Sequence, residues 1–141
     1  MQIQTNVSLK SHNSFGIDVS AANLLELNDA QQLEAVFADN TLPKPVRIIG
    51  GGSNILLTEG VKGLVLLNRV KGITVLKEDE DHVLVEVMSG EVWHDFVLHA
   101  IDKGWGGIEN LALIPGTVGA APMQNIGAYG KELKDNFVSC D

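Results

Sequence analysis

Residues 113–130 form the segment that most limits how this chain can fold. The segment contains four glycines, two prolines and one aromatic ring, and it carries no charge. Pro115 and Pro122 lack the N–H that a strand ladder needs, and the glycines and prolines make a long helix unfavourable. Because the segment is too apolar for an ordinary solvated loop, we expect a folded-in loop whose backbone closely approaches another group. A Cβ atom is expected to collide at each of its glycines: Gly116, Gly119, Gly127 and Gly130.

Backbone N–H groups beside glycines bind anions, and a short helix beginning near Val118 would direct its positive end towards a phosphate. A second loop of this kind follows the predicted strand Val46–Ile49 and reads Gly50, Gly51, Gly52, Ser53, Asn54. It does not match a dinucleotide fingerprint, because Ile55 occupies the place of the third glycine, and it lacks the Gly-Lys-Ser/Thr of a Walker A loop. A single triple glycine is equally consistent with a tight turn. Two such loops in one small chain favour a nucleotide-type ligand.

Composition sets the broad class of the protein. The 141 residues are 45% hydrophobic and 20% charged, which predicts a soluble globular protein. No apolar run is long enough to span a bilayer, the N-terminus lacks a signal-peptide pattern, and Cys140 has no partner for a disulfide, so we expect a cytoplasmic protein. The net charge of -8 argues against nucleic acid as a partner, but not against a phosphate held by backbone amides.

The first half of the chain alternates strand and helix signals. A strand over residues 24–27 is expected to lead into a helix that is N-capped by Asn28, has Asp29 in its first turn and ends near Asp39. Leu33, Val36 and Phe37 are expected to share the buried face of this helix. A buried parallel strand, Val46–Ile49, and a third strand over residues 63–67 complete the pattern. This order places the first glycine loop at the carboxyl end of a strand, where ligands of α/β sheets bind.

The second half reads differently. Residues 73–76 and 83–88 predict an antiparallel hairpin, and its acidic tip, residues 78–81, is interpreted as a solvated turn rather than a metal site. Ser89 is expected to cap a helix that runs from Gly90 or Glu91 to Lys103, with Gly104 ending it. Its buried side is expected to carry these apolar residues: Val92, Phe96 and Ala100, with Trp93 and Val97 beside them. His94 and His99 are five residues apart and therefore do not form a paired metal site.

The two glycine-rich motifs together resemble a known family. Residues 50–54, 114–119 and 124–130, with the lead-in Asn13-Ser14-Phe15-Gly16, are similar to the UDP-N-acetylenolpyruvoylglucosamine reductases. These flavoenzymes reduce an enolpyruvyl ether to make UDP-N-acetylmuramic acid for peptidoglycan. The resemblance implies an α+β fold of the FAD-binding type-2 class (PCMH/VAO-like), with FAD as cofactor, NADPH as hydride donor and a UDP-sugar as substrate. It implies one FAD-binding subdomain over residues 1–69 and an incomplete second one over residues 70–141, with the substrate domain absent.

The resemblance also implies which residues contact the flavin. They come from both glycine-rich segments: Gly50, Gly51, Gly52, Ser53, Asn54, Ile55, Ile114, Pro115, Gly116, Thr117, Gly119, Ala120, Ala121, Met123, Ile126 and Gly127. Ala120 and Ala121 replace serines of some relatives, so backbone rather than hydroxyl contacts to phosphate are expected there. Tyr129 is a candidate for a substrate-proximal residue, and a packed ring bonded through its hydroxyl is an equally good interpretation. The family's catalytic serine, arginine and glutamate are expected beyond Asp141, and no metal is implied.

Two alternatives stay open at this point. One is another flavin oxidoreductase of the same fold, although neither glycine loop contains the histidine or cysteine that covalent flavin attachment requires. The other is a non-catalytic module that binds a nucleotide sugar. If the substrate domain is missing, we expect a chain that turns over nothing by itself and that associates through uncovered strand edges and apolar surface.

Overall fold

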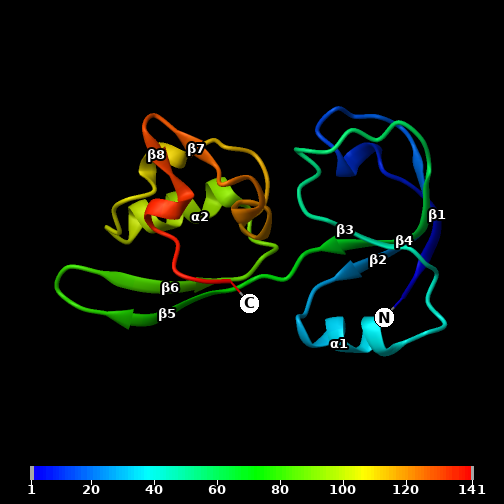
Figure 1. Ribbon diagram of the computed structural model, residues 1–141, viewed down its shortest axis with the longest axis horizontal. Coiled ribbons are helices and arrows are strands. Elements are labelled where there is room, and N and C mark those ends of the chain that lie inside the picture. Colours follow the sequence, from blue (N-terminus) through cyan, green and yellow to red (C-terminus); the bar gives the residue numbers. More distant parts are fainter. Residues whose placement is uncertain (1, 141) are drawn as a thin grey trace. The chain divides into compact units, whose positions relative to one another are not determined.

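The computed structural model describes residues 2–140, and the chain divides into two compact units (Figure 1). Unit 1 is Met1–Val70 and unit 2 is Lys71–Asp141. Each unit contains both helix and strand, and each has its own hydrophobic core, so they are described separately. The assignment of residues 1–69 and 70–141 as two FAD-binding subdomains stays a prediction.

Unit 1 is built on a four-stranded sheet. In chain order the strands are β1 (Gln4–Ser8), β2 (Ser20–Leu27), β3 (Val46–Ile49) and β4 (Val61–Asn68), and their order in the sheet is β1-β2-β4-β3. β1 pairs antiparallel with β2, whereas β2 and β3 both pair parallel with β4. A short 3-10 turn, η1 (Lys10–His12), follows β1. The three predicted strands are therefore confirmed, and two of them extend further than the sequence indicates.

The central strand β4 explains the core of unit 1. Successive side chains of a strand point to opposite faces, and four consecutive residues of β4 are fully buried (Leu64, Val65, Leu66 and Leu67). Leu64 and Leu66 pack with Val36 of the helix α1 (Gln31–Ala38) on one face. Val65 and Leu67 pack on the other face with a second cluster: Leu9, Ala21, Leu24 and Ile49. The sheet is therefore covered on both sides.

Three expectations for unit 1 are wrong in detail. β3 is the edge strand next to β4, so only its last residue, Ile49, is buried rather than the whole strand. α1 has Ala30 and not Asn28 at its N-cap. Asp29 lies before the helix and accepts the N–H groups of Gln31 (at Oδ1, 2.9 Å) and Gln32 (at its carbonyl oxygen, 3.1 Å). Phe37 is 53% exposed. It lies one residue beyond Val36, which takes the position facing the sheet.

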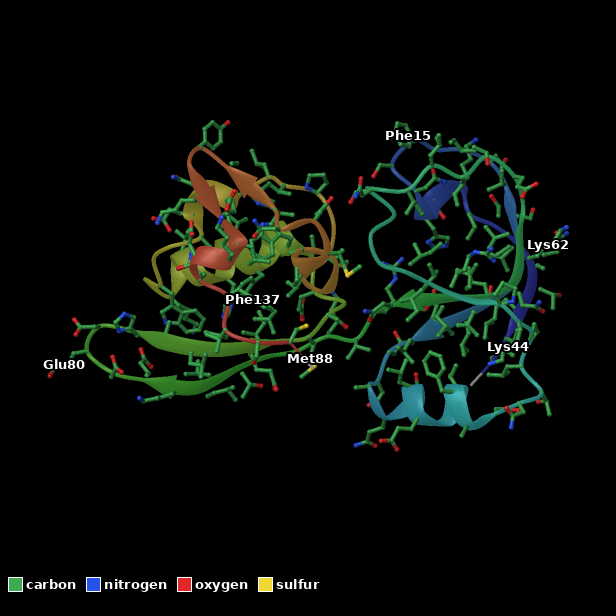
Figure 2. All side chains as sticks on the ribbon, viewed as in Figure 1. Phe15, Lys44, Lys62, Glu80, Met88 and Phe137 are labelled. Atoms are coloured by element: carbon green, nitrogen blue, oxygen red, sulfur yellow. The ribbon has the colours of Figure 1, made fainter. Side chains whose placement is uncertain are left out.

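Unit 2 combines a hairpin with one helix and a series of short turns. β5 (Ile73–Glu78) and β6 (Val83–Val87) pair antiparallel, as the sequence predicts. Asp79 closes the tip by accepting hydrogen bonds from the N–H groups of Asp81 and His82, and Glu80 projects from this tip in Figure 2. These bonds lower the pKa of Asp79 below its ordinary value. The acidic tip is thus a self-bonded turn. Among residues 2–140, no group of three His, Cys, Asp or Glu side chains is arranged to hold a metal.

The rest of unit 2 folds around the helix α2 (Trp93–Asp102). After α2 come the 3-10 turns η2 (Glu109–Leu111), η3 (Val118–Ala120) and η4 (Pro122–Gln124), the paired strands β7 (Gly127–Ala128) and β8 (Lys131–Glu132), and η5 (Leu133–Asp135). The core contains these buried residues: Trp93, Val97, Ala100, Ile108, Leu111, Ala121, Ile126 and Leu133. None of the helices among residues 2–140 has the length and apolar character to cross a membrane.

The predicted start of α2 is wrong by two or three residues. Val92 is the N-cap, with extended backbone, and no side chain caps the helix. The backbone of Val92 pairs with Thr117 in an isolated antiparallel bridge, which keeps this part of the chain out of the helix. Val92 is consequently 40% exposed instead of buried, and Trp93, Val97 and Ala100 form the buried side. Gly104 ends the helix as predicted, with a left-handed φ of 76°.

Candidate functional site

The glycine loop of unit 1 begins directly after β3 and packs against the lead-in turn. Gly52 is buried and has a φ of 66°. A Cβ at Gly52 would lie 2.0 Å from the carbonyl oxygen of His12 and 2.9 Å from Cα of Asn13. The carbonyl oxygen of Gly52 also accepts a hydrogen bond from the N–H of Ser14, at 3.1 Å. Only glycine therefore fits at this position, for both conformational and steric reasons.

Asn13 holds the lead-in turn in the shape that receives Gly52. Its side chain is buried, and its Nδ2 donates to the carbonyl oxygens of Leu9 (2.7 Å) and Ile17 (3.0 Å). Its Oδ1 accepts from the N–H of Ile17 at 3.0 Å. The sequence indicated this region only as the lead-in that shares in the family resemblance. The signal that could have identified this turn as the support of the glycine loop is an asparagine that is buried and bonds backbone groups on both sides of the turn.

The amides of this loop are left available. Within residues 2–140, the N–H groups of Gly51, Gly52 and Ser53 donate to no backbone or side-chain acceptor. Three successive unbonded N–H groups at a strand end have the donor chemistry that suits phosphate oxygens. The loop thus fits an anionic group without any basic side chain.

The glycine-rich segment of unit 2 uses four successive amides internally, those of Val118 to Ala121. Val118 donates to the carbonyl oxygen of Glu91 (2.9 Å) and Gly119 to that of Ser89 (2.9 Å). Ala120 and Ala121 donate within the turn, to Thr117 and Val118. The expectation that a helix beginning near Val118 offers its positive end to a phosphate is therefore wrong, because the residues preceding α2 already occupy that end. Within the described chain, the N–H groups of this segment that make no hydrogen bond include those of Ile114, Gly116 and Thr117.

The four glycines of this segment serve different purposes. The predicted collision is confirmed at Gly119, where a Cβ would lie 2.5 Å from Cβ of Ser89. At Gly127 a Cβ would make a tight contact, 3.0 Å from the carbonyl oxygen of Lys131, and at Gly130 the predicted collision is wrong. Gly130 has open space around it, so its requirement is the left-handed φ of 79°. Gly116 has a φ of 120°, which likewise favours glycine. At Gly119 and Gly127 the close approach is thus to unit 2 itself.

The first turn of α2 holds the start of this segment. The indole N–H of Trp93 donates to the carbonyl oxygen of Leu111 at 2.8 Å in the buried core. The backbone N–H of Trp93 donates to the carbonyl oxygen of Gly116 at 3.0 Å, and the ring nitrogen Nδ1 of His94 accepts from the N–H of Leu113 at 3.1 Å. Sequence reasoning missed both residues, since it considered His94 only as a metal ligand. Trp93 and His94 are the first two residues of α2, and their contacts with the segment are visible only in the tertiary structure.

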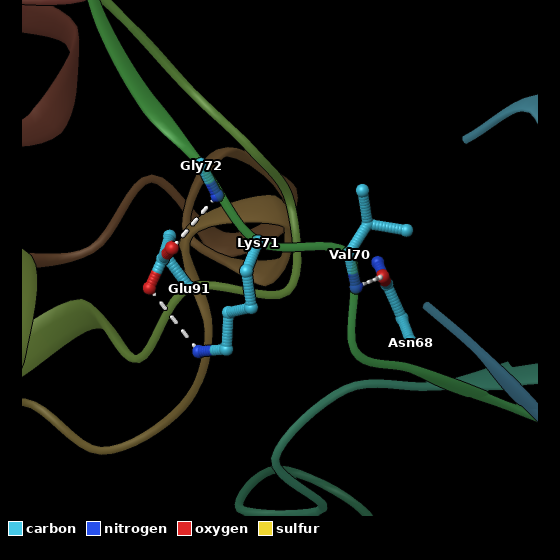
Figure 3. Close-up of polar contacts among 5 residues, drawn as sticks. All are labelled: Asn68, Val70, Lys71, Gly72 and Glu91. Atoms are coloured by element: carbon cyan, nitrogen blue, oxygen red, sulfur yellow. Dashed lines mark hydrogen bonds and ion pairs between the residues drawn. The ribbon is translucent and has the colours of Figure 1, made fainter. Parts of the chain in front are cut away.

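Glu91, which lies shortly before α2, is bonded to the two residues that precede β5. Glu91 accepts hydrogen bonds from the N–H of Gly72 (2.8 Å) and from Nζ of Lys71 (3.2 Å), as Figure 3 shows. In unit 1, the N–H of Val70 donates to Oδ1 of Asn68 at 3.2 Å. The Glu91 carbonyl also receives Val118, so this residue ties the segment to the first residues of unit 2.

An open hollow lies beside the second half of the segment. Its volume is about 790 Å³, and its lining comprises Ile114, Gln124, Asn125, Ile126, Gly127, Ala128, Gly130, Lys131, Glu132, Lys134 and Asp135. Glu132 and Lys134 form an ion pair there, which lowers the pKa of Glu132 and raises that of Lys134. The hollow therefore combines an apolar part with a charged rim.

Only three of the predicted contact residues line this hollow (Ile114, Ile126 and Gly127), and Met123 and Tyr129 are among those that lie outside the lining. Met123 is 87% exposed, and Tyr129 is 88% exposed in a left-handed conformation (φ 53°) at the turn between β7 and β8. The interpretation of Tyr129 as a packed ring is therefore wrong. Its exposure leaves the candidate role beside substrate as a prediction.

Comparison with known proteins bears on which anion these amides serve. Residues 21–141 match the family model described as "FAD binding domain". The chain is 50% identical to the UDP-N-acetylenolpyruvoylglucosamine reductase of Flavobacterium johnsoniae, over 100% of this chain and 42% of that protein. It is 50% identical to the protein of the same name from Chromobacterium violaceum, over 98% of this chain and 41% of that one. The chain thus spans about two-fifths of the length of these curated relatives.

A solved structure agrees with the fold. The crystal structure of the UDP-N-acetylenolpyruvylglucosamine reductase from Thermus caldophilus superposes with a TM-score of 0.72 and 26% identity, covering 96% of this chain and 46% of that chain. The α+β FAD-binding fold predicted from the motifs is confirmed. By the family match over residues 21–141, and by two units of mixed helix and strand that present unbonded loop amides, this chain belongs to the FAD binding domain family.

Proposed function

We propose that this chain supplies the FAD-binding part of an enzyme that reduces UDP-N-acetylenolpyruvoylglucosamine to UDP-N-acetylmuramate, with NADPH as the hydride donor. The relatives at 50% identity carry the name of this reductase, which supports the reaction. The observation that carries the proposal is the row of unbonded amides at Gly51, Gly52 and Ser53 in a member of the FAD binding domain family. The product is a peptidoglycan precursor, so the setting would be the cytoplasm of a bacterium that builds a cell wall, with effects on cell shape and division.

The chain's residues have distinct tasks in this proposal. In unit 1, the amides of Gly51, Gly52 and Ser53 are the donors for oxygens of the FAD pyrophosphate, and in unit 2 the amides of Gly116 and Thr117 are further donors for FAD. Backbone donors suit this task in a chain of net charge -8, because they neutralise phosphate without a cluster of lysines. Ile114 and Ile126 offer apolar contacts from the hollow. Bound flavin supplies the hydride transfer, and the protein positions it.

The remaining candidate residues take smaller parts. Gly50, Asn54 and Ile55 flank the amide row, and Pro115 sets the backbone before Gly116. The role of Gly119, Ala120 and Ala121 is structural, since their amides donate hydrogen bonds to acceptors within unit 2. Met123 and Tyr129 are exposed and available to a flavin or a substrate.

A ligand series tests the proposal. FAD, riboflavin and UDP-N-acetylglucosamine are titrated into the ¹⁵N-labelled chain, and both the flavin spectrum and the amide shifts are followed. We expect FAD to bind and riboflavin, which lacks the pyrophosphate, to bind on the order of 100-fold more weakly, because charge-assisted hydrogen bonds to phosphate are lost. The amides of Gly51, Gly52, Ser53, Gly116 and Thr117 should shift most.

The same series separates the alternatives. Equal affinity for FAD and riboflavin would contradict the role of the amides. Binding of the sugar nucleotide without any binding of FAD would favour a nucleotide-sugar module instead.

A further inference from the structure

Leu113 adopts a backbone conformation that is unusual for its residue type. Its φ is 64°, in the left-handed region, and its side chain is 78% exposed. A non-glycine residue in this region costs on the order of 1–3 kcal/mol and persists only when its surroundings impose it. The exposed side chain of Leu113 provides little burial to offset this cost, so the constraint must come from its backbone.

The N–H of Leu113 is held by one side chain. The N–H of Leu113 donates to Nδ1 of His94 at 3.1 Å. A backbone N–H can only donate, so Nδ1 must be the unprotonated nitrogen of a neutral imidazole and the ring proton lies on Nε2. His94 thus acts as a hydrogen-bond acceptor with a defined tautomer.

His94 is itself held on a rigid support. It is the second residue of α2, next to Trp93, which is buried and donates to the carbonyl oxygens of both Leu111 and Gly116. Leu111, Leu113 and Gly116 are therefore each bonded to the first turn of α2. Between and after these points lie the unbonded amides of Ile114, Gly116 and Thr117.

We infer that His94 is a positioning residue for the FAD-binding segment. Its neutral imidazole holds Leu113 in the left-handed conformation and so sets the direction of the amides at Ile114, Gly116 and Thr117. This inference rests on the proposed function for the identity of the ligand. The hydrogen bond and the tautomer are properties of the chain alone.

Three variants of the 141-residue chain test the role of the acceptor. In His94→Asn, Oδ1 lies near the place of Nδ1, whereas His94→Ala removes the acceptor. His99→Ala is the matched control, because His99 lies on the same helix but contacts Trp105 (ring centroids 5.6 Å apart). We expect His94→Ala to weaken FAD binding on the order of 10-fold, His94→Asn to stay within about 3-fold of the original chain, and His99→Ala to leave affinity unchanged.

Two readouts do not need the flavin. Amide exchange at Leu113 should be slow in the original chain and in His94→Asn and fast in His94→Ala. Long-range ¹H–¹⁵N correlation should show His94 with its proton on Nε2, and this measurement holds even if His94→Ala fails to fold. Glycine adopts a left-handed φ without cost, so adding Leu113→Gly to His94→Ala should recover part of the lost FAD affinity.

The outcomes are distinguishable from failure of the proposed function. If the original chain binds no FAD, the proposed function fails, while Leu113 exchange and the tautomer still decide the hydrogen bond. A proton on Nδ1, unchanged Leu113 exchange in His94→Ala, or unchanged FAD affinity in that variant would each overturn the inference.

Discussion

The two glycine-rich segments have similar composition but differ in how their amides are used. In unit 1, Gly52 packs under the lead-in turn, and the N–H groups of Gly51, Gly52 and Ser53 have no partner within residues 2–140. In unit 2, the amides of Val118 to Ala121 are all bonded within the unit. The glycine content of a loop therefore reports close approach or unusual φ, and only the hydrogen-bond pattern tells whether its amides can serve a ligand.

The supports of the two segments also differ. The unit 1 loop is held by one buried asparagine, Asn13, through backbone groups on both sides of a turn. The unit 2 segment is held by a helix, through Trp93 and His94, and by the carbonyl oxygens of Ser89 and Glu91. In unit 1 we expect any atom added at Gly52 to disturb the packing of the loop against the lead-in turn. In unit 2 we expect each substitution to remove one hydrogen bond and to leave the others in place.

Gly52→Ala should have the largest effect on stability. The new Cβ would lie 2.0 Å from the carbonyl oxygen of His12 at a left-handed φ, so we expect a loss of about 4 kcal/mol or more in the free energy of unfolding. The control is Gly16→Ala, because Gly16 has nearly the same φ (64°) and nothing within 4 Å, and it should lose only about 1 kcal/mol. Urea denaturation measures both. Equal losses of unfolding free energy in the two variants would show that the left-handed φ, and not the close contact with His12, determines the effect of Gly52→Ala.

Gly119→Ala should have the next largest effect. Its Cβ would lie 2.5 Å from Cβ of Ser89, and the resulting overpacking should cost about 2–3 kcal/mol. Gly106→Ala provides the comparison, since Gly106 has open space around it and should change stability by less than about 0.5 kcal/mol. Thermal and urea unfolding of the two variants should differ clearly. A Gly119→Ala variant as stable as Gly106→Ala would mean that unit 2 is not closely packed at this point.

Trp93→Phe tests one bond between α2 and the segment. Loss of the indole N–H leaves the buried carbonyl oxygen of Leu111 without this donor, and we expect a loss of about 1–3 kcal/mol. Trp105→Phe removes an indole from a residue that is only partly buried, and should cost less. If hydrogen exchange near Leu111 is unchanged in Trp93→Phe, the bond does not hold the segment.

The smallest expected effect concerns acid pH. The pKa of Glu109 lies below its ordinary value, because its carboxylate accepts hydrogen bonds from its own N–H and from that of Gly107. A carboxyl group with a lowered folded-state pKa stabilises the fold above its unfolded pKa, and this contribution is lost as pH falls through the folded value. Glu109→Gln should therefore be less stable than the original chain at pH 7, and the gap should close below about pH 4. Urea midpoints at both pH values measure it, and a gap that persists in acid would contradict the assignment.

Several elements were predictable because their signals are local. The strand Val46–Ile49, the hairpin formed by β5 and β6, and the helix end at Gly104 follow from apolar alternation, turn residues and glycine. The helix starts were not predictable. Asn28 and Ser89 are good N-cap residues, yet the carbonyl oxygen of Ser89 is needed by Gly119, and the N–H of Asn28 is bonded to Gln32. At Ser89 a long-range partner outweighed the local cap preference, whereas at Asn28 the partner lies only four residues along the chain.

The sequence by itself determined that this chain has two side-chain-poor segments, one directly after a strand, because glycine and proline restrict a backbone wherever they occur. Through their resemblance to a known family, the motifs also indicated the α+β FAD-binding fold. Which amides stay available was decided only by the tertiary structure. A backbone N–H has the same donor chemistry at every non-proline residue, and its fate depends on the carbonyl or imidazole that folding places 3 Å away. Ser89, Glu91 and His94 became such partners of the unit 2 segment through folding, and no partner of this kind within the described chain reached Gly51, Gly52 or Ser53.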